Sequence, residues 1–248
     1  MKTIKILTIL IFFLPAIQVN ARQSSSDNLT YTAYMKNSLS LWEKAVKSKQ
    51  SADTESSDKT DKLDLAMTYY GYMGATVATE NEEAFKKYLD PAKDMLKQMI
   101  EDYPEWGEPK AVLSSVMGLE MAFSPLKGAF LGMKSSSLMS EAMKQNPESP
   151  LVLKLYAGSK QYTPAMWGGD KKLAAEYMQK SIEAYEKQGV TEKNWLYADA
   201  LANLGIVYAM MDKKQEAAQV YNKALVYEPD FQWVRYSLMP ELADNDKN

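Results

Sequence analysis

The chain contains neither histidine nor cysteine. The absence of histidine excludes a Ser-His-Asp triad, a histidine general base and a histidine-ligated zinc site. With cysteine absent as well, both usual ligands of transition metals are missing. We therefore expect no enzymatic activity and no cofactor or metal. Disulfides are excluded too, so the burial of apolar side chains must stabilise the fold.

Arginine is almost absent, since Arg22 and Arg235 are the only two in the chain. The formal net charge is −3, and lysines alternate with acidic residues along the sequence. A nucleic-acid-binding protein usually gathers lysine and arginine on one face. The charge pattern indicates solvated helix surfaces instead, and we expect no nucleic-acid partner.

The N-terminal segment has the pattern of a secretory signal peptide. Lys2 and Lys5 precede an apolar stretch, residues 6–17, and Val19 and Ala21 are small residues at the spacing that signal peptidase requires. We expect cleavage after Ala21 and a periplasmic or secreted chain; a retained membrane anchor is the alternative. A lipoprotein is excluded, because no cysteine is present to carry the lipid. We expect residues 22–248 to form one helical repeat domain without a membrane span.

Apolar residues recur at helical spacing through the rest of the chain, and no run alternates as a strand would. The clearest pattern lies between residues 198 and 231: Leu201, Leu204, Gly205, Tyr208, Ala217, Tyr221, Ala224 and Pro229. Their order and spacing resemble the tetratricopeptide repeat (TPR), a pair of antiparallel helices. The fold class that this implies is all-α: a TPR-like solenoid of helix pairs with a C-terminal capping helix.

The pattern assigns each of these residues a structural role. Leu201, Leu204 and Tyr208 share one face of a first helix, and Gly205 allows the second helix to approach closely. The expected helices of the whole chain are 28–49, 60–79, 82–103, 108–123, 134–145, 149–161, 171–187, 192–211, 214–227 and 230–238. Pro91 either kinks the third helix or splits it. Residues 48–62 are expected to form a loop.

Weaker copies of the repeat precede this pattern. Gly71, Gly118, Gly158 and Gly205 each fall in an expected first helix, 40 to 47 residues apart. A regular TPR has about 34 residues, so we expect the surplus in the connections within each pair. Two connections are extended: residues 124–132 and 162–170. Both are rich in glycine, proline and apolar residues, and functional residues often lie on such loops.

The second connection supplies the candidate site. We expect Tyr156, Tyr162, Trp167, Gly168, Gly169 and Asp170 to bind a ligand or partner. A purely structural interpretation is also open. Asp170 would then cap the following helix, the two glycines would form the turn and Trp167 would pack on a neighbouring repeat.

Taken together, the chain resembles secreted or periplasmic TPR-like proteins of Gram-negative bacteria. The Thr163-Pro164 and Gly168-Gly169-Asp170 elements are also similar to the periplasmic T component of TRAP transporters. The first resemblance implies a non-enzymatic scaffold for a protein or peptide. The second implies a carrier of a small or hydrophobic molecule in a pocket built from Tyr156, Tyr162 and Trp167. Ala202 and Ile206 occupy the positions where carboxylate-clamp TPR domains have lysine and asparagine, so that binding mode is not expected.

Overall fold

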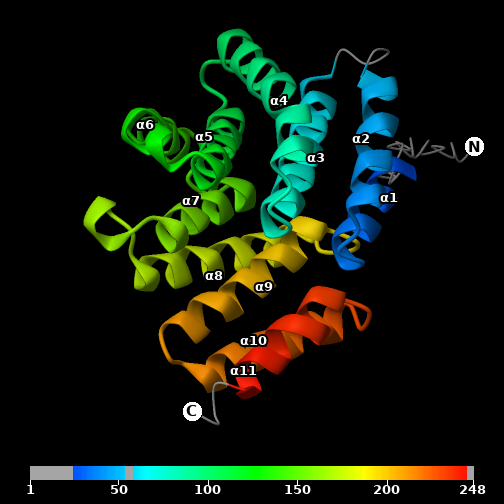
Figure 1. Ribbon diagram of the computed structural model, residues 1–248, viewed down its shortest axis with the longest axis vertical. Helices are drawn as coiled ribbons and strands as arrows, with labels where there is room; N and C mark the ends of the chain where they lie inside the picture. The colour runs from blue at the N-terminus through cyan, green and yellow to red at the C-terminus, as the bar shows by residue number, and fades with distance from the viewer. Residues whose placement is uncertain (1–24, 54–57, 245–248) are drawn as a thin grey trace, which may run out of the picture.

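The computed structural model describes residues 25–53 and 58–244, and this part of the chain is helical throughout, without strands. Ten of its helices form five consecutive pairs (Figure 1): α1 (Ser25–Met35) with α2 (Leu39–Asp53), α3 (Lys59–Ala78) with α4 (Glu82–Asp102), α5 (Gly107–Phe123) with α6 (Gly128–Gln145), α7 (Pro150–Tyr162) with α8 (Lys171–Gln188), and α9 (Trp195–Met210) with α10 (Lys214–Tyr227). The expected all-α, TPR-like solenoid is confirmed.

The first helices of the pairs form the inner layer. α3 contacts α5, α5 contacts α7 and α7 contacts α9, whereas the second helices contact the neighbouring pairs mainly through the following first helix. This is the arrangement of a solenoid, in which each pair buries its apolar side against its neighbours. The connections within the pairs consequently lie at one edge of the stack, and the connections between the pairs lie at the other.

The last pair has the packing that the repeat pattern predicts. A Cβ added at Gly205 would lie only 2.2 Å from Cε1 of Tyr221, so glycine is required where α9 and α10 cross. Ala217, Tyr221 and Ala224 are buried on α10. After α10, the π-helix η3 (Val234–Leu238) and α11 (Met239–Asp244) cover the open end and bury Phe231, Val234 and Leu238, as expected of a capping segment.

Two boundaries differ from the sequence prediction at the N-terminal end. The single helix expected over 28–49 is wrong: α1 ends at Met35 and α2 begins at Leu39. Asn37 adopts the left-handed conformation at φ 45°, and the Ser38 amide donates to the Ala33 carbonyl at 3.0 Å. This closes α1 as a Schellman-type end, in which asparagine tolerates the positive φ. The loop expected over 48–62 is shorter, because α2 extends to Asp53 and α3 begins at Lys59.

α6 is longer than expected, and α4 follows the first of the two alternatives at Pro91, a single undivided helix. α6 begins at Gly128 rather than at residue 134, so most of the first extended connection is helix; only the short 3-10 turn η1 (Pro125–Lys127) precedes it. α4 runs through Pro91 as one helix. Pro91 is exposed on α4, so its ring lies on the side of the helix away from the core. The predicted signal peptide, residues 1–21, lies outside the described residues.

The first pair packs against the last. Tyr34 of α1 lies 5.5 Å from Trp195 and 5.4 Å from Phe231 between ring centroids, and Trp42 of α2 lies 5.2 Å from Trp195. The Tyr31 hydroxyl donates to Glu228 at 2.8 Å. The stack of helix pairs therefore closes on itself, with α1 against α9 (Figure 1).

Candidate partner-binding surfaces

Hydrogen bonds within its own backbone fix the conformation of the connection between α7 and α8. It contains the 3-10 turn η2 (Ala165–Trp167), and the Trp167 and Gly169 amides both donate to the Pro164 carbonyl, at 2.8 and 3.2 Å. Gly168 has φ +92°, and a Cβ at Gly169 would lie 1.8 Å from the Thr163 oxygen. Both glycines are therefore needed for this turn.

Asp170 ends the connection and begins α8. One of its carboxylate oxygens accepts hydrogen bonds from the Lys172 and Leu173 amides at 2.9 and 3.0 Å, which is the geometry of a helix N-cap. The Asp170 amide donates to the Lys160 carbonyl at 2.9 Å and ties the connection back to α7. The expected structural roles of Gly168, Gly169 and Asp170 are thus confirmed, whereas binding by these residues stays a prediction.

The apolar side chains of this connection project into solvent. Met166 is 82% exposed and Trp167 is 74% exposed. The interpretation that Trp167 packs on a neighbouring repeat is therefore wrong, and its indole is available to a partner.

Tyr156 and Tyr162 lie on different sides of α7. Six residues separate them, which places them about 120° apart around a helix. The Tyr156 ring packs against Tyr177 of α8 at 4.6 Å, and the Lys160 ammonium lies 5.3 Å from its centre. Tyr162 is 66% exposed, but its hydroxyl reaches inward and donates to Asn203 of α9 at 3.0 Å. The six predicted residues therefore do not surround one pocket.

A buried polar cluster lies on the inner side, between α1, α3, α7 and α9. Lys154 forms an ion pair with Asp199, which also accepts a hydrogen bond from the Tyr34 hydroxyl, and the Lys154 ammonium lies 5.9 Å from the centre of the Tyr70 ring. Burial alone would lower the pKa of Lys154, but the charge of Asp199 outweighs it and raises that pKa. Burial and the same carboxylate raise the pKa of Tyr34. Lys154 thus stays a cation inside the protein.

Three glycines of the first helices leave part of the helix surface uncovered. Two lie one turn beyond this cluster, on α3 and α7, and the third lies on α5, between those helices. A Cβ added at Gly74 of α3, Gly118 of α5 or Gly158 of α7 would meet no atom within 4 Å. Gly74 follows Tyr70 by four residues, and Gly158 follows Lys154 by four, so both continue the faces on which the buried cluster lies. We call the uncovered sides of α3, α5 and α7 at Gly74, Gly118 and Gly158 the glycine faces.

A group of exposed apolar residues combines the predicted Trp167 with four side chains that the sequence analysis did not single out. Five side chains on η1, α6 and η2 form what we call the apolar edge: Leu126 (98% exposed), Phe130 (86%), Met133 (78%), Met166 and Trp167. The sequence contains a pattern that indicates the first three side chains, because residues 126, 130 and 133 have the i, i+4, i+7 spacing of one helix face. Assigning residues 124–132 to a loop obscured it.

Two open surface pockets lie elsewhere. One, of about 440 Å³, is lined by Glu108, Gln145, Asn146, Pro147, Glu148, Ser149, Pro150 and Gln188. The other, of about 340 Å³, is lined by Lys59, Tyr103, Pro104, Glu105 and Trp106. Neither includes the residues expected to form a carrier pocket. Among the described residues, no group of three or more acidic side chains is placed to hold a metal ion.

The paired helices, the glycine crossing at Gly205 and the capping segment define a TPR-like helical fold. Comparisons with known proteins agree with this class. The family model of the tetratricopeptide repeat matches residues 198–231. The fold is similar to the crystal structure of a thermophilic TPR protein of Thermus thermophilus, with a TM-score of 0.55 and 15% sequence identity over 89% of this chain and 98% of that one. A comparison with curated proteins finds no match.

Proposed function

We propose that this chain is an exported, non-enzymatic scaffold that binds a protein or peptide partner across the glycine faces. The observation that carries the proposal is the set of three glycines inside the first helices α3, α5 and α7 at which an added Cβ would meet no atom within 4 Å. A glycine inside a helix costs about 0.5–1 kcal/mol relative to alanine. Gly71 and Gly205 have an internal reason, since Trp42 and Tyr221 fill the space beside them. Gly74, Gly118 and Gly158 have none, and they leave backbone accessible to a partner.

The surroundings of Gly158 support the same surface. Gln161 lies one turn further along α7, is only 3% exposed, and neither atom of its amide has a hydrogen-bond partner in the described part of the chain. A buried polar group without a partner costs about 1–3 kcal/mol. A bound segment next to Gly158 would supply the missing bonds if the Gln161 side chain turned towards it, since both amide atoms are buried in the free protein. The exposed ring of Tyr162 follows Gly158 by four residues and adds the type of side chain that is enriched at interface hot spots.

The test fills the glycine faces without disturbing the fold. Gly118→Leu and Gly158→Leu add a side chain at positions where a new Cβ would meet no atom within 4 Å. The protein and its variants are cross-linked in the extracytoplasmic fraction of the source cell, and the captured proteins are compared by mass spectrometry. Val226→Leu is the matched control, because Val226 is exposed on the outer helix α10.

We expect the same partner to be captured by the wild type and by Val226→Leu, and to be lost from both glycine variants. Circular dichroism should show that all variants remain folded. Capture that is unchanged in the glycine variants would contradict the proposed surface. Native mass spectrometry that shows a bound small molecule and no protein partner would contradict the scaffold function itself.

A further inference from the structure

We propose that the apolar edge docks on the anionic surface of a lipid bilayer, an interaction separate from the partner binding proposed above. The side chains of Leu126, Phe130, Met133, Met166 and Trp167 are each about three-quarters or more exposed. Among the described residues, the other large apolar side chains that are more than 70% exposed are Val226 and Tyr236, which lie apart on α10 and η3. Five such residues on two connections form a concentrated patch, and such patches mark sites of interaction.

The shape of the apolar edge favours a bilayer over a folded protein. Its side chains project from η1, from the start of α6 and from η2, rather than lining a recess. A folded protein partner would need a separate pocket for each projecting side chain. Lipid chains are fluid and can pack around all of these side chains at once. Tryptophan, phenylalanine and leucine are the residues that interfacial membrane-binding segments insert at the boundary between head groups and acyl chains.

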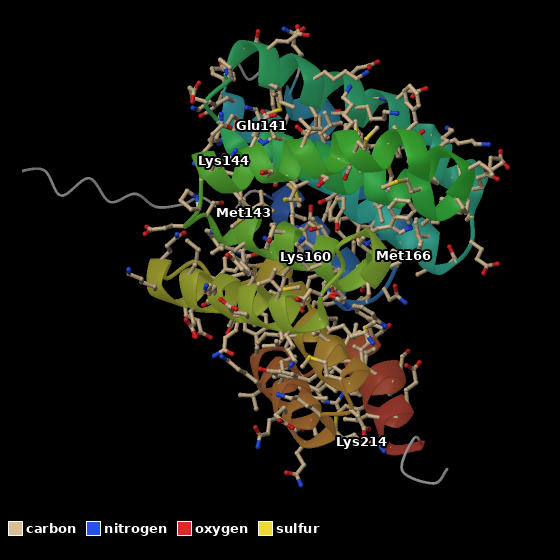
Figure 2. The ribbon with its side chains drawn as sticks, turned by 90° about the vertical axis from the view of Figure 1, so that its left-hand side faces the viewer. Glu141, Met143, Lys144, Lys160, Met166 and Lys214 are labelled. Atoms are coloured by element: carbon tan, nitrogen blue, oxygen red, sulfur yellow. The ribbon has the colours of Figure 1, made fainter. Side chains whose placement is uncertain are left out.

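Both parts of the apolar edge lie on the same side of the molecule. Figure 1 shows the α7–α8 connection on the same side as α6, and Figure 2 shows Met166 toward the end of α6 that is opposite to Met143 and Lys144. Since Met143 and Lys144 belong to the C-terminal turn of α6, Met166 lies toward its N-terminal half, where Phe130 and Met133 are found. The two connections can therefore contact one surface together.

The charge around the apolar edge matches an anionic surface. Residues 124–136 and 160–173 contain five lysines, Lys127, Lys134, Lys160, Lys171 and Lys172, and one acidic residue, Asp170, in a chain whose net charge is −3. The Asp170 carboxylate is already used as the N-cap of α8. Glu120 pairs with Lys127, and Asp90 and Glu82 of α4 also act on this lysine. Lys134 and Lys172 are exposed and form no ion pair within the described residues. Basic residues beside inserted apolar ones are attracted to anionic lipid head groups.

The test measures binding to vesicles. The protein is purified from the extracytoplasmic fraction of the expressing cell, and its intact mass establishes where the chain begins. Flotation is measured with vesicles of equal parts phosphatidylcholine and phosphatidylglycerol, and with phosphatidylcholine alone. The variants are the triple change Leu126→Ser, Phe130→Ser and Trp167→Ser, the charge reversal Lys134→Glu with Lys172→Glu, and the control Val226→Ser with Tyr236→Ser.

We expect the wild type and the control to bind the anionic vesicles, and the triple variant to bind at least about tenfold more weakly. The charge reversal should weaken binding about tenfold, and raised salt should weaken binding of the wild type. Thermal unfolding checks that each variant is folded. Absence of wild-type binding, equal binding to neutral vesicles, or equal loss in the control would each overturn the proposal. A self-associating wild type that becomes monomeric in the triple variant would assign the apolar edge to a protein interface instead.

Discussion

At the scale of single residues, helical glycines divide into two groups with opposite roles. Gly205 lies where two helices cross, and its missing side chain gives room to Tyr221, which is almost fully buried. Gly158 occupies a similar position in the repeat but faces open space. Both are glycines inside a first helix, so only the neighbouring helix distinguishes packing from accessibility.

The two groups should respond differently to alanine. We expect Gly205→Ala to lower the free energy of unfolding by about 1–3 kcal/mol, because the new methyl group overpacks the crossing. Gly158→Ala should raise it by up to about 1 kcal/mol, because alanine favours the helix. Urea unfolding of both variants measures the difference. Similar destabilisation of both would show that Gly158 is packed as Gly205 is.

Glu120 gives a residue-scale prediction that depends on pH. Its buried carboxylate accepts from Lys93 at 2.7 Å and from Lys127 at 2.8 Å. Burial acts to raise the pKa of Glu120, but the two lysines outweigh it and hold that pKa below its usual value. The stabilisation is therefore fully present above the unfolded-state pKa of about 4.3 and is lost as the pH falls through the lower folded-state value.

We expect Glu120→Gln to lower the free energy of unfolding at neutral pH by about 1–3 kcal/mol. The difference from the wild type should shrink below pH of about 4. Unfolding measured across this range checks both statements. Glu82→Gln is the control, because Glu82 pairs with Lys86 on an exposed surface where such pairs contribute about 0–1 kcal/mol. A difference that does not change with pH would argue against the carboxylate as its source.

At the scale of elements, different residues of the α7–α8 connection serve the stability of the fold and the proposed binding. Its backbone and Asp170 fix the start of α8, whereas Met166 and Trp167 contribute little buried surface to the fold. We therefore expect Asp170→Ala to lower the free energy of unfolding by about 1 kcal/mol, because the cap of α8 is lost. Trp167→Ala should change it by less than about 0.5 kcal/mol.

Thermal or urea unfolding of these two variants provides the measurement, and Asp170→Asn serves as the control because asparagine also caps helices. A large loss of stability in Trp167→Ala would mean that the indole packs on the protein. The side chain would then be unavailable to the membrane-docking surface proposed above.

At the scale of the whole molecule, contacts between the first and the last pair close the stack of helix pairs. The cluster at this closure joins Tyr34 of α1, Lys154 of α7 and Asp199 of α9. A buried ion pair contributes little net stability compared with apolar residues, but loss of one partner leaves an uncompensated buried charge. The closure is therefore sensitive to single changes.

We expect Asp199→Leu to destabilise the protein by about 3–5 kcal/mol, because Lys154 would remain buried without its partner. Adding Lys154→Met should restore much of this loss. The free energies of unfolding of both single variants and of the double variant form the cycle that isolates the coupling. A double variant as unstable as Asp199→Leu alone would show that the ion pair is not the source of the effect. Hydrogen exchange of α1 should report loosening of the closure in Asp199→Leu.

The sequence by itself determined the helical class and the repeat. The 3.6-residue apolar period, Gly205 with Tyr221, and Asp170 as a cap all act between neighbours along the chain, where spacing specifies the contact. Only the tertiary structure decided which glycines have free space beside them and that the Trp167 side chain is exposed. It also decided that α1 packs against α9. Those features depend on residues far apart in the sequence, such as Tyr34 and Asp199, and their contact arises only when all five pairs have stacked.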